Sequence, residues 1–241
     1  MSTYVLVHGA WHGPWCWEKV IPVLKQAGHR VETPDLSGYG QDKTFREITL
    51  TTYTQRVCET LDAQAEPVIL VGHSLGGIVI SQVAEERPEK IQSLVYLTAF
   101  LVQNGESLFQ IAQMNSDSLV TSNLVVNEEQ GSLTFKEGAP LKDMFYSDCS
   151  DEDVARATSL LVPGALAPQE TPVRISAEHF GRVPRVYIEC LRDRALTPSF
   201  QKRMYMATPC QAILSMETSH SPFFSAPQEL VHHLTSRLFV S

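Results

Sequence analysis

The segment Gly72-His-Ser-Leu-Gly76 contains a serine between two glycines at the spacing G-x-S-x-G. It directly follows the apolar run 67–71 and directly precedes the apolar run 77–80. A serine at such a strand-to-helix turn raises its hydroxyl from the end of a sheet, at the N-terminus of a helix. The pattern predicts an acyl-transferring hydrolase with Ser74 as nucleophile. The alternative is a glycine-rich turn that carries no chemistry.

A serine hydroxyl needs a base within hydrogen-bond reach, and that base needs an orienting acid. When a serine occupies such a turn, the chain order is Ser, then Asp or Glu, then His, each on a loop that follows a strand. Asp193 follows the strand-like run 185–190, and His220 follows the run 212–216. The chain has eight histidines, and His220 is the one in the required loop. We predict His220 as the base and Asp193 as the acid.

Acyl transfer also needs two backbone N–H groups directed at the oxygen that gains charge. Leu75, the residue after the nucleophile, supplies one N–H group in this interpretation. Ala10 supplies the other, because it lies in the glycine-containing loop 8–13 that follows the first apolar run. The glycine spacing in this loop is not G-x-G-x-x-G, so a dinucleotide site is not expected.

The elements that must hold these groups follow from the alternation of short apolar runs with amphipathic stretches, which is typical of a parallel sheet covered by helices. We predict an α/β fold with a mostly parallel central sheet of about six strands and helices on both faces. The expected strands are Tyr4–His8, His29–Thr33, Val68–Gly72, Ser93–Thr98, Arg185–Cys190 and Ala212–Met216. The expected helices cover residues 17–27, 51–64, 75–86, 198–207 and 227–239.

The alternation fails between residues 100 and 183, where polar runs replace the strand signals. We interpret this stretch as a small helical cap inserted before the last two strands, so that residues 1–99 and 184–241 form the core domain. One helix within it is clear, with Ser150 as its N-cap and three acidic residues in its first turn. A cap at this position covers the edge of the sheet where ligands bind. Trp11, Phe109, Met114 and Phe145 are the expected substrate-binding residues.

Composition narrows the classes of partner. The formal net charge of −8 argues against nucleic acid and anionic membrane surfaces. No run approaches the roughly 20 apolar residues of a membrane span, and the first residues show no signal-type segment, so a cytoplasmic location is expected. The five cysteines form no C-x-x-C pair, so neither a disulfide framework nor a zinc site is indicated. The assembly state stays open, with a homodimer as one alternative.

Taken together, these motifs resemble the α/β-hydrolase superfamily. The resemblance rests on HGAWHGPWCW at 8–17, DLSGYG at 35–40, GHSLGG at 72–77, Asp193 with Phe200-Gln201 behind it, and His220. The most similar branch is that of plant methylesterases and hydroxynitrile lyases with their bacterial esterase relatives. The resemblance implies a Ser74–Asp193–His220 triad, an oxyanion hole at Ala10 and Leu75, and neither a cofactor nor a metal.

Two departures distinguish the branches of this group. The lyases carry Thr at the position of Gly9 and Lys at the position of Ser221, and those side chains handle the alcohol and the cyanide. Their absence favours ester hydrolysis. We therefore expect a serine esterase acting on small, largely apolar carboxylic esters. The alternatives are a hydroxynitrile lyase, a cofactor-free dioxygenase on the same fold, and a small-ligand receptor.

Overall fold

The computed structural model describes residues 1–36 and 44–236, and its centre is a six-stranded sheet. The strands follow the order β2-β1-β3-β4-β8-β9, and every neighbouring pair is parallel within the described residues. Their bounds are Thr3–Val7 (β1), Arg30–Glu32 (β2), Val68–Ser74 (β3), Ile91–Ala99 (β4), Arg185–Cys190 (β8) and Ala212–Met216 (β9). The prediction of a parallel sheet of about six strands is confirmed.

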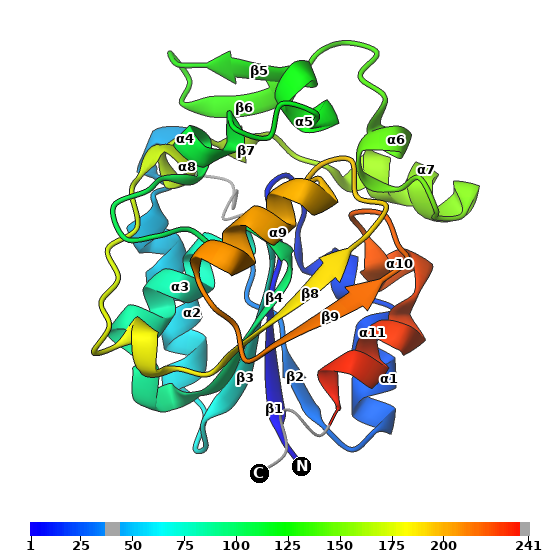
Figure 1. Ribbon diagram of the computed structural model, residues 1–241. Coiled ribbons are helices and arrows are strands. Elements are labelled where there is room, and N and C mark those ends of the chain that lie inside the picture. The colour runs from blue at the N-terminus through cyan, green and yellow to red at the C-terminus, as the bar shows by residue number, and fades with distance from the viewer. Residues whose placement is uncertain (37–43, 237–241) are drawn as a thin grey trace.

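Helices cover both faces of this sheet. One face carries α2 and α3, which contact each other, and the opposite face carries α1 and α11 (Figure 1). The helices are α1 (Val20–Gln26), α2 (Leu50–Asp62), α3 (Gly76–Glu86), α9 (Pro198–Ala207), α10 (Pro222–Ser225) and α11 (Pro227–Leu234). Short 3₁₀ turns span Pro14–Trp17 (η1), Phe45–Glu47 (η2), Pro88–Lys90 (η3) and Phe180–Arg182 (η4).

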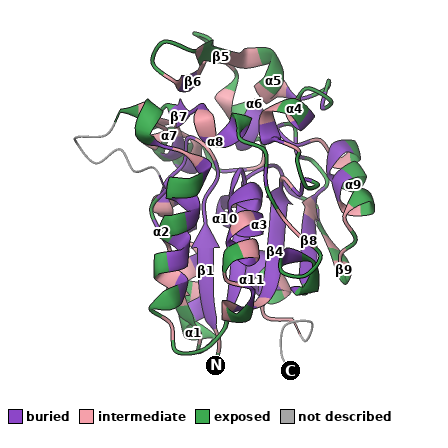
Figure 2. Ribbon diagram, turned by 90° about the vertical axis from the view of Figure 1, so that its left-hand side faces the viewer, coloured by how far each residue is buried: buried purple, intermediate pink, exposed green. Residues whose placement is uncertain are grey.

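The side chains of the inner strands β1, β3, β4 and β8 divide between two apolar cores, one on each face. In β1, Val5 and Val7 pack in the core under α2 and α3, while Tyr4 and Leu6 pack in the core under α1 and α11. This division follows from the two-residue period of a strand. Because both faces of these inner strands are covered, they are largely apolar along their length rather than alternating, and Figure 2 shows β1 and β4 as buried.

The expected element bounds differ from the observed ones mainly at the ends. The helix expected over 17–27 is divided into the turn η1 and α1, and β2 is shorter than the run that predicted it. The helix expected to reach 239 is described as far as Leu234, and residues 237–239 lie outside the described residues. Four residues of the DLSGYG motif, 37–40, also lie outside them.

The stretch 100–183, here called the cap segment, passes over the carboxyl ends of the central strands (Figure 1). It contains α4 (Leu108–Ala112), α5 (Leu119–Asn123), β5 (Leu124–Asn127), β6 (Ser132–Phe135), α6 (Leu141–Phe145), α7 (Asp151–Leu160), β7 (Gly164–Ala165) and α8 (Ala167–Glu170). The helix expected after Ser150 is present as α7, and Ser150 Oγ accepts from the Asp153 N–H at 3.1 Å.

The expectation of a purely helical cap is wrong, because β5, β6 and β7 form a three-stranded antiparallel sheet. A glycine at positive φ, Gly131, ends the turn between β5 and β6. These strands are only two to four residues long, and each residue of β5 is exposed or half-buried. Short strands with exposed side chains lack the apolar alternation by which a sequence indicates a strand.

The order of the central strands reverses between β1 and β3. From β1 the chain crosses through α1 to β2, and from β3 it crosses through α3 to β4 on the opposite side. In open α/β sheets, ligands bind in the crevice at the carboxyl ends of the strands beside such a reversal. The loops that follow β1 and β3 are therefore the first place to look for a site.

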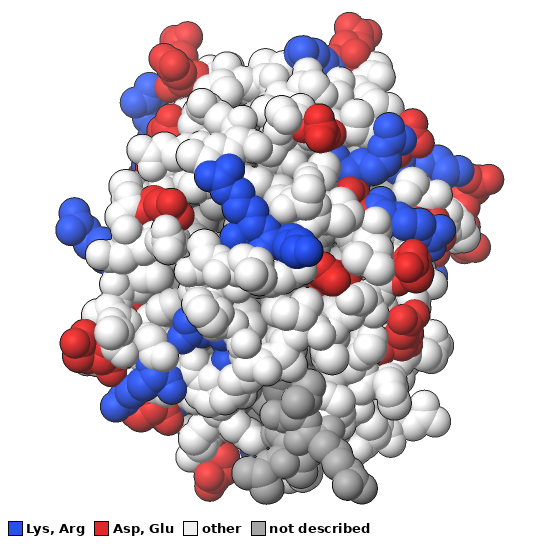
Figure 3. Space-filling view, viewed as in Figure 1, with Lys and Arg blue, Asp and Glu red and all other residues white. Residues whose placement is uncertain are grey.

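The surface in the view of Figure 1 carries acidic and basic side chains interspersed rather than gathered in a patch of one sign (Figure 3). Among residues 1–36 and 44–236, none of the helices has the length and apolar character needed to cross a bilayer.

Candidate active site

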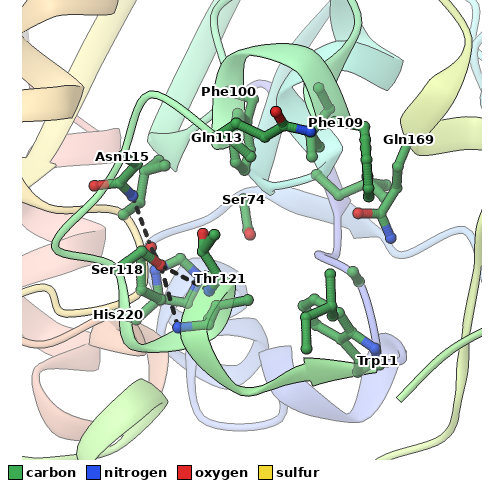
Figure 4. A pocket seen from close by; sticks show the side chains of 18 of the residues that line it. Trp11, Ser74, Phe100, Phe109, Gln113, Asn115, Ser118, Thr121, Gln169 and His220 are labelled. Carbon is green, nitrogen blue, oxygen red and sulfur yellow. Dashed lines mark hydrogen bonds between the residues drawn. The ribbon is translucent and has the colours of Figure 1, made fainter. Parts of the chain in front are cut away.

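Ser74 ends β3 in a backbone conformation that is rare for a residue with a side chain. Its φ is 52°, in the left-handed region where only glycine is free of steric cost. The turn lets α3 begin two residues later, at Gly76, so that the Ser74 side chain points into a cavity (Figure 4). This is the strained strand-to-helix turn expected of a nucleophilic serine.

The glycines around Ser74 are required by close backbone approaches. A Cβ on Gly72 would lie 2.7 Å from the carbonyl oxygen of Gly76, and a Cβ on Gly76 would lie 2.8 Å from that of Val7. A Cβ on Gly77 would overlap the carbonyl oxygen of Phe100. The G-x-S-x-G spacing therefore reflects how tightly α3 packs against β1, β3 and β4.

The predicted acid and base are joined directly. The Nδ1–H of His220 donates to Asp193 Oδ2 at 2.6 Å, and both side chains are buried. The other oxygen of the Asp193 carboxylate accepts from the backbone N–H groups of Ala195 and Leu196 at 2.7 and 2.8 Å. An ionised carboxylate only accepts hydrogen bonds, and these donors fix its position. The Nε2 of His220 therefore remains for a proton on the cavity side.

Two residues without an assigned role in the sequence analysis hold the acid loop. The Thr98 hydroxyl donates to Asp193 Oδ2 at 2.5 Å from the end of β4, where Thr98 has a φ of 36°. The Gln201 side chain, buried in α9, accepts from the Cys190 N–H at 3.0 Å and donates to the Leu196 carbonyl at 2.7 Å. The position of Gln201 behind Asp193 was the only sequence signal for this clamp.

His73, next to Ser74, holds the loop of His220. Its Nε2–H donates to the His220 carbonyl at 2.8 Å. Burial lowers the pKa of His73 well below its usual value, so the ring is neutral and carries its single proton on Nε2. The expectation that His73 is a packed residue agrees with its burial and adds this contact.

Ser74 and His220 line the same cavity (Figure 4). Across the described residues, Ser74 Oγ makes no hydrogen bond to the imidazole of His220. In enzymes without substrate, such hydrogen bonds are often long and tighten only in the complex. Ser74 and His220 therefore meet at one cavity, and Asp193 is linked to it through its hydrogen bond to His220.

The predicted oxyanion donors, Ala10 and Leu75, line this cavity beside Ser74. Leu75 is the N-cap of α3, where backbone N–H groups have no acceptor within the helix. The Ala10 N–H belongs to the same planar peptide as the Gly9 carbonyl, which accepts from His8 Nδ1 at 2.9 Å. His8 Nε2 in turn accepts from the Leu36 N–H at 3.0 Å. His8 therefore sets the direction of the Ala10 N–H.

Gly9 lies against the nucleophile. A Cβ on Gly9 would be 2.9 Å from Ser74 Cβ and 3.0 Å from His73 Nδ1. The loop after β1 and the turn after β3 thus meet at van der Waals distance, as the reversal in strand order requires.

The cavity has a volume of about 250 Å³, and its wall is mostly apolar. Of the four predicted substrate-binding residues, Trp11, Phe109 and Phe145 line it. Its polar side chains besides Ser74 and His220 are Gln113, Asn115, Ser118, Thr121 and Gln169. Within the described part of the chain, none of its lining residues is Asp, Glu, Lys or Arg.

Met114 departs from the expectation. Its side chain is 54% exposed and lies in a separate surface hollow that also contains Asp117 and Arg203. The helix α4 ends at Ala112, and the turn that follows it closes with the Met114 N–H on the Ile111 carbonyl. This turn directs Ile111 inward and Met114 outward, a difference that the apolar character of both residues does not reveal.

The five cysteines are free thiols, and four of them are buried. Burial raises the pKa of Cys58 and of Cys149 to about 12, so these thiols are poor nucleophiles at neutral pH. Among the described residues, no group of three His, Cys, Asp or Glu side chains is arranged to hold a metal ion.

Comparison with known proteins agrees with this geometry. The model of the alpha/beta hydrolase family matches residues 4–233. Salicylic acid-binding protein 2 of Nicotiana tabacum is 36% identical over 242 residues, which cover 94% of this chain and 93% of that protein. Methylesterase 1 of Arabidopsis thaliana is 34% identical over 246 residues, which cover 94% and 92%.

Among solved structures, that of polyneuridine aldehyde esterase is similar over 97% of this chain and 98% of its own, with a TM-score of 0.85 and 28% identity. Sequence and fold thus agree with these relatives along nearly the whole chain. On this evidence, the chain belongs to the alpha/beta hydrolase family.

Proposed function

We propose that this protein is a serine esterase that hydrolyses small, largely apolar carboxylic esters. Its relatives include methylesterases and an esterase of the same fold, so the chain is a carboxylic ester hydrolase. The observation that carries the mechanism is the buried Asp193–His220 pair, joined at 2.6 Å, on a cavity into which Ser74 points.

In the proposed reaction, Ser74 Oγ attacks the ester carbonyl carbon while His220 Nε2 takes the hydroxyl proton. The backbone N–H groups of Ala10 and Leu75 stabilise the oxyanion of the tetrahedral intermediate. His220 then gives the proton to the leaving alkoxide, which departs as the alcohol. The acyl group remains bonded to Ser74 Oγ.

Deacylation repeats these steps with water. His220 removes a proton from water, the hydroxide attacks the acyl carbon, and the proton returns to Ser74 Oγ as the carboxylic acid leaves. Asp193 holds the His220 ring in the tautomer that leaves Nε2 free, and it stabilises the imidazolium that forms in each half-reaction.

The character of the cavity supports a neutral substrate. Its described lining contains no Asp, Glu, Lys or Arg that would pair with a charged group, and burying an unpaired charge is costly. Trp11, Phe109 and Phe145 offer an apolar wall to the acyl or alcohol part of the ester. The amides of Gln113 and Gln169 offer hydrogen bonds to one polar substituent.

We also propose that residues 100–183 act as a cap subdomain on a core formed by residues 1–99 and 184–241. The support is that Phe109, Phe145 and Gln169 come from the cap segment, whereas Ser74 and His220 come from loops after central strands. In this division the cap sets substrate choice, and the core carries the chemistry.

The decisive variant is Ser74→Ala, assayed with p-nitrophenyl acetate and a panel of methyl, aryl and lactone esters. Without the nucleophile, we expect kcat/KM to fall by at least about a thousandfold, with an unchanged circular dichroism spectrum. The matched control is Ser159→Ala, at an exposed serine of α7, which is expected to keep full activity.

Retained turnover in Ser74→Ala would refute the mechanism. Stoichiometric labelling of Ser74 by a fluorophosphonate, without multiple turnover of any ester, would instead favour a small-ligand receptor. Release of cyanide from mandelonitrile or uptake of oxygen with a heteroaromatic substrate would favour the other enzyme classes.

A further inference from the structure

The cap residues Phe145–Asp148 contact three of the four segments that carry the proposed catalytic groups. These residues, which we call the bridging segment, connect α6 to α7. They reach the loop of Ala10 after β1, the loop of Asp193 after β8 and the loop of His220 after β9. The contacting residues lie far apart in the sequence: Tyr146 is 134 positions from His12, and Asp148 is 71 positions from Ser219.

The first contact runs from Tyr146 through His12 to Ala10. His12 Nε2 lies 2.7 Å from the Tyr146 hydroxyl, and His12 Nδ1 lies 2.9 Å from the Ala10 carbonyl oxygen. Burial lowers the pKa of His12 to about 3, so the ring is neutral and has one N–H. Since a carbonyl only accepts, that proton is on Nδ1, and the Tyr146 hydroxyl donates to Nε2. The direction of both hydrogen bonds is thereby determined.

The loop held in this way is strained. Trp11 has a φ of 62°, which is unfavourable for a residue with a side chain. Two further hydrogen bonds from the cap segment secure it: the Val162 N–H donates to the Trp11 carbonyl at 3.0 Å, and the Trp11 Nε1–H donates to the Leu133 carbonyl at 3.1 Å. Contacts from the cap therefore keep the proposed oxyanion loop in a conformation that the loop alone would not prefer.

The second contact runs from Asp148 to the loops of the base and the acid. Asp148 Oδ2 accepts from the Ser219 N–H at 2.9 Å, and Asp148 Oδ1 accepts from the Ser219 hydroxyl. Asp148 Oδ2 also lies 3.4 Å from Arg192 Nη2. Ser219 directly precedes His220, and Arg192 directly precedes Asp193. One carboxylate of the cap segment is thus shared between the two loops whose side chains form the Asp193–His220 pair.

Phe145 completes the segment. Its carbonyl accepts from the Ser219 hydroxyl at 3.3 Å, and its ring lies 5.7 Å from the His220 ring, centroid to centroid. The ring also lines the cavity. The segment therefore touches the substrate space and the backbone behind it at the same time.

We propose that Tyr146 and Asp148 of the bridging segment are positioning residues for the esterase reaction. Tyr146 holds the Ala10 loop through His12, and Asp148 holds the His220 and Asp193 loops through Ser219 and Arg192. The cap is then part of the catalytic geometry as well as the wall of the pocket. The proposal rests on the proposed function, because it concerns the same Ser74-dependent hydrolysis.

The first test is Tyr146→Phe, which keeps the ring and removes only the hydroxyl. We expect kcat for p-nitrophenyl acetate to fall about tenfold with KM within about twofold, because the oxyanion is stabilised more in the transition state than in the bound ester. The inhibition constant of a boronic acid that forms a tetrahedral adduct on Ser74 should rise by a similar factor. The matched control is Tyr205→Phe in α9. It removes a hydroxyl that donates a hydrogen bond to Glu189 at 3.1 Å.

A second background tests whether Tyr146 acts through His12. In a His12→Ala protein, Tyr146→Phe should cause no further loss of kcat, because the link it would break is already absent. Independent losses that multiply would contradict this route.

The second test is Asp148→Asn, with Asp151→Asn as control. Asp151 is an exposed carboxylate of the same region that pairs with Lys142. We expect kcat to fall about tenfold in Asp148→Asn, and the downfield proton resonance of the His220–Asp193 hydrogen bond to shift or broaden. Asp151→Asn should leave both unchanged. If Asp148→Asn does not fold, Ser219→Ala takes its place. It removes the hydroxyl contacts of Ser219 to Asp148 and to the Phe145 carbonyl and keeps the backbone N–H contact to the Asp148 carboxylate.

Wild type and Ser74→Ala are measured in the same assays. An active Ser74→Ala protein refutes the proposed function itself. An inactive Ser74→Ala protein, together with wild-type kcat and boronate affinity in Tyr146→Phe and wild-type kcat in Asp148→Asn, refutes only the positioning role. If Tyr146→Phe and Asp148→Asn lower both kcat and the melting temperature while the boronate affinity stays unchanged, the bridging segment only contributes packing, and the positioning role is refuted.

Discussion

At the scale of single residues, the site depends on side chains and backbones held away from their preferred states. Ser74, Thr98 and Trp11 all have positive φ without being glycine. Ser74 and Trp11 line the cavity, and Thr98 donates a hydrogen bond to Asp193. Such conformations cost of order 1–3 kcal/mol each and persist only where the surroundings determine them. Here the surroundings are the glycine contacts below α3 and the hydrogen bonds from the cap segment.

A pair of variants at Ser74 measures this strain. Both Ser74→Gly and Ser74→Ala remove the hydroxyl, but only alanine keeps the Cβ that makes a φ of 52° unfavourable. We expect Ser74→Gly to have the higher free energy of unfolding by about 1 kcal/mol. This is the strain that glycine relieves, minus the extra chain entropy that glycine loses on folding. Urea denaturation of the two proteins gives the difference directly. An alanine variant as stable as the glycine variant would mean that the strain in this turn is no larger than the entropic cost of glycine.

At the scale of elements, the placement of α3 decides where Ser74 stands. The helix approaches β4 so closely that a Cβ on Gly77 would overlap the Phe100 carbonyl. Alanine is a better helix former than glycine by about 1 kcal/mol, so an unobstructed helical position would gain stability from the exchange. The overlap of the new Cβ with the Phe100 carbonyl acts in the opposite direction. The stability of Gly77→Ala therefore shows whether helix propensity or steric overlap has the larger effect.

We expect Gly77→Ala to lower the free energy of unfolding by about 1–3 kcal/mol, because overlap with a backbone atom outweighs the helix propensity. In thermal denaturation this corresponds to a Tm lower by roughly 2–4 °C per kcal/mol for a chain of this size. Gln55→Ala, at an exposed position of α2, serves as the helical control and should change little. A Tm that rises in Gly77→Ala would show that the helix can move away from β4 at no cost.

At the scale of the whole molecule, the buried histidines couple stability to pH. Burial lowers the pKa of His12 to about 3 and that of His73 well below its ordinary value of 6.5. Between the folded and the unfolded pKa values, the unfolded chain binds more protons than the folded one. Stability therefore rises with pH across this interval and is lost as the pH falls below about 6.5.

We expect the free energy of unfolding to decrease below pH 6.5 by up to about 1.4 kcal/mol per pH unit for each of these histidines. Chemical denaturation at a series of pH values between 4 and 8 measures the slope. His12→Asn should reduce the slope of the unfolding free energy against pH by an amount that corresponds to about one bound proton. His232→Asn, at an exposed position of α11, should leave the slope unchanged. An identical slope in His12→Asn would mean that His12 is protonated in the folded state.

The sequence alone determined the sheet, its order of helices and strands, and the loops on which Ser74, Asp193 and His220 lie. These inferences succeeded because parallel strands are continuous apolar runs and their carboxyl ends meet at one edge of the sheet. In the sequence, Thr98 is only the last residue of an expected strand and has no predicted role. The structure instead joins its hydroxyl to Asp193 at 2.5 Å.

Only the tertiary structure decided the contacts of Thr98, Tyr146 and Asp148, the antiparallel strands of the cap segment and the outward direction of Met114. Each depends on residues far apart in the chain or on which side of a short turn a side chain leaves. Local patterns of polarity carry neither kind of information, because a hydrogen bond between distant loops requires no periodicity in either one. The place of Ser74 at the end of a strand could therefore be predicted from the sequence, whereas the contacts that support its surroundings could be found only in the folded molecule.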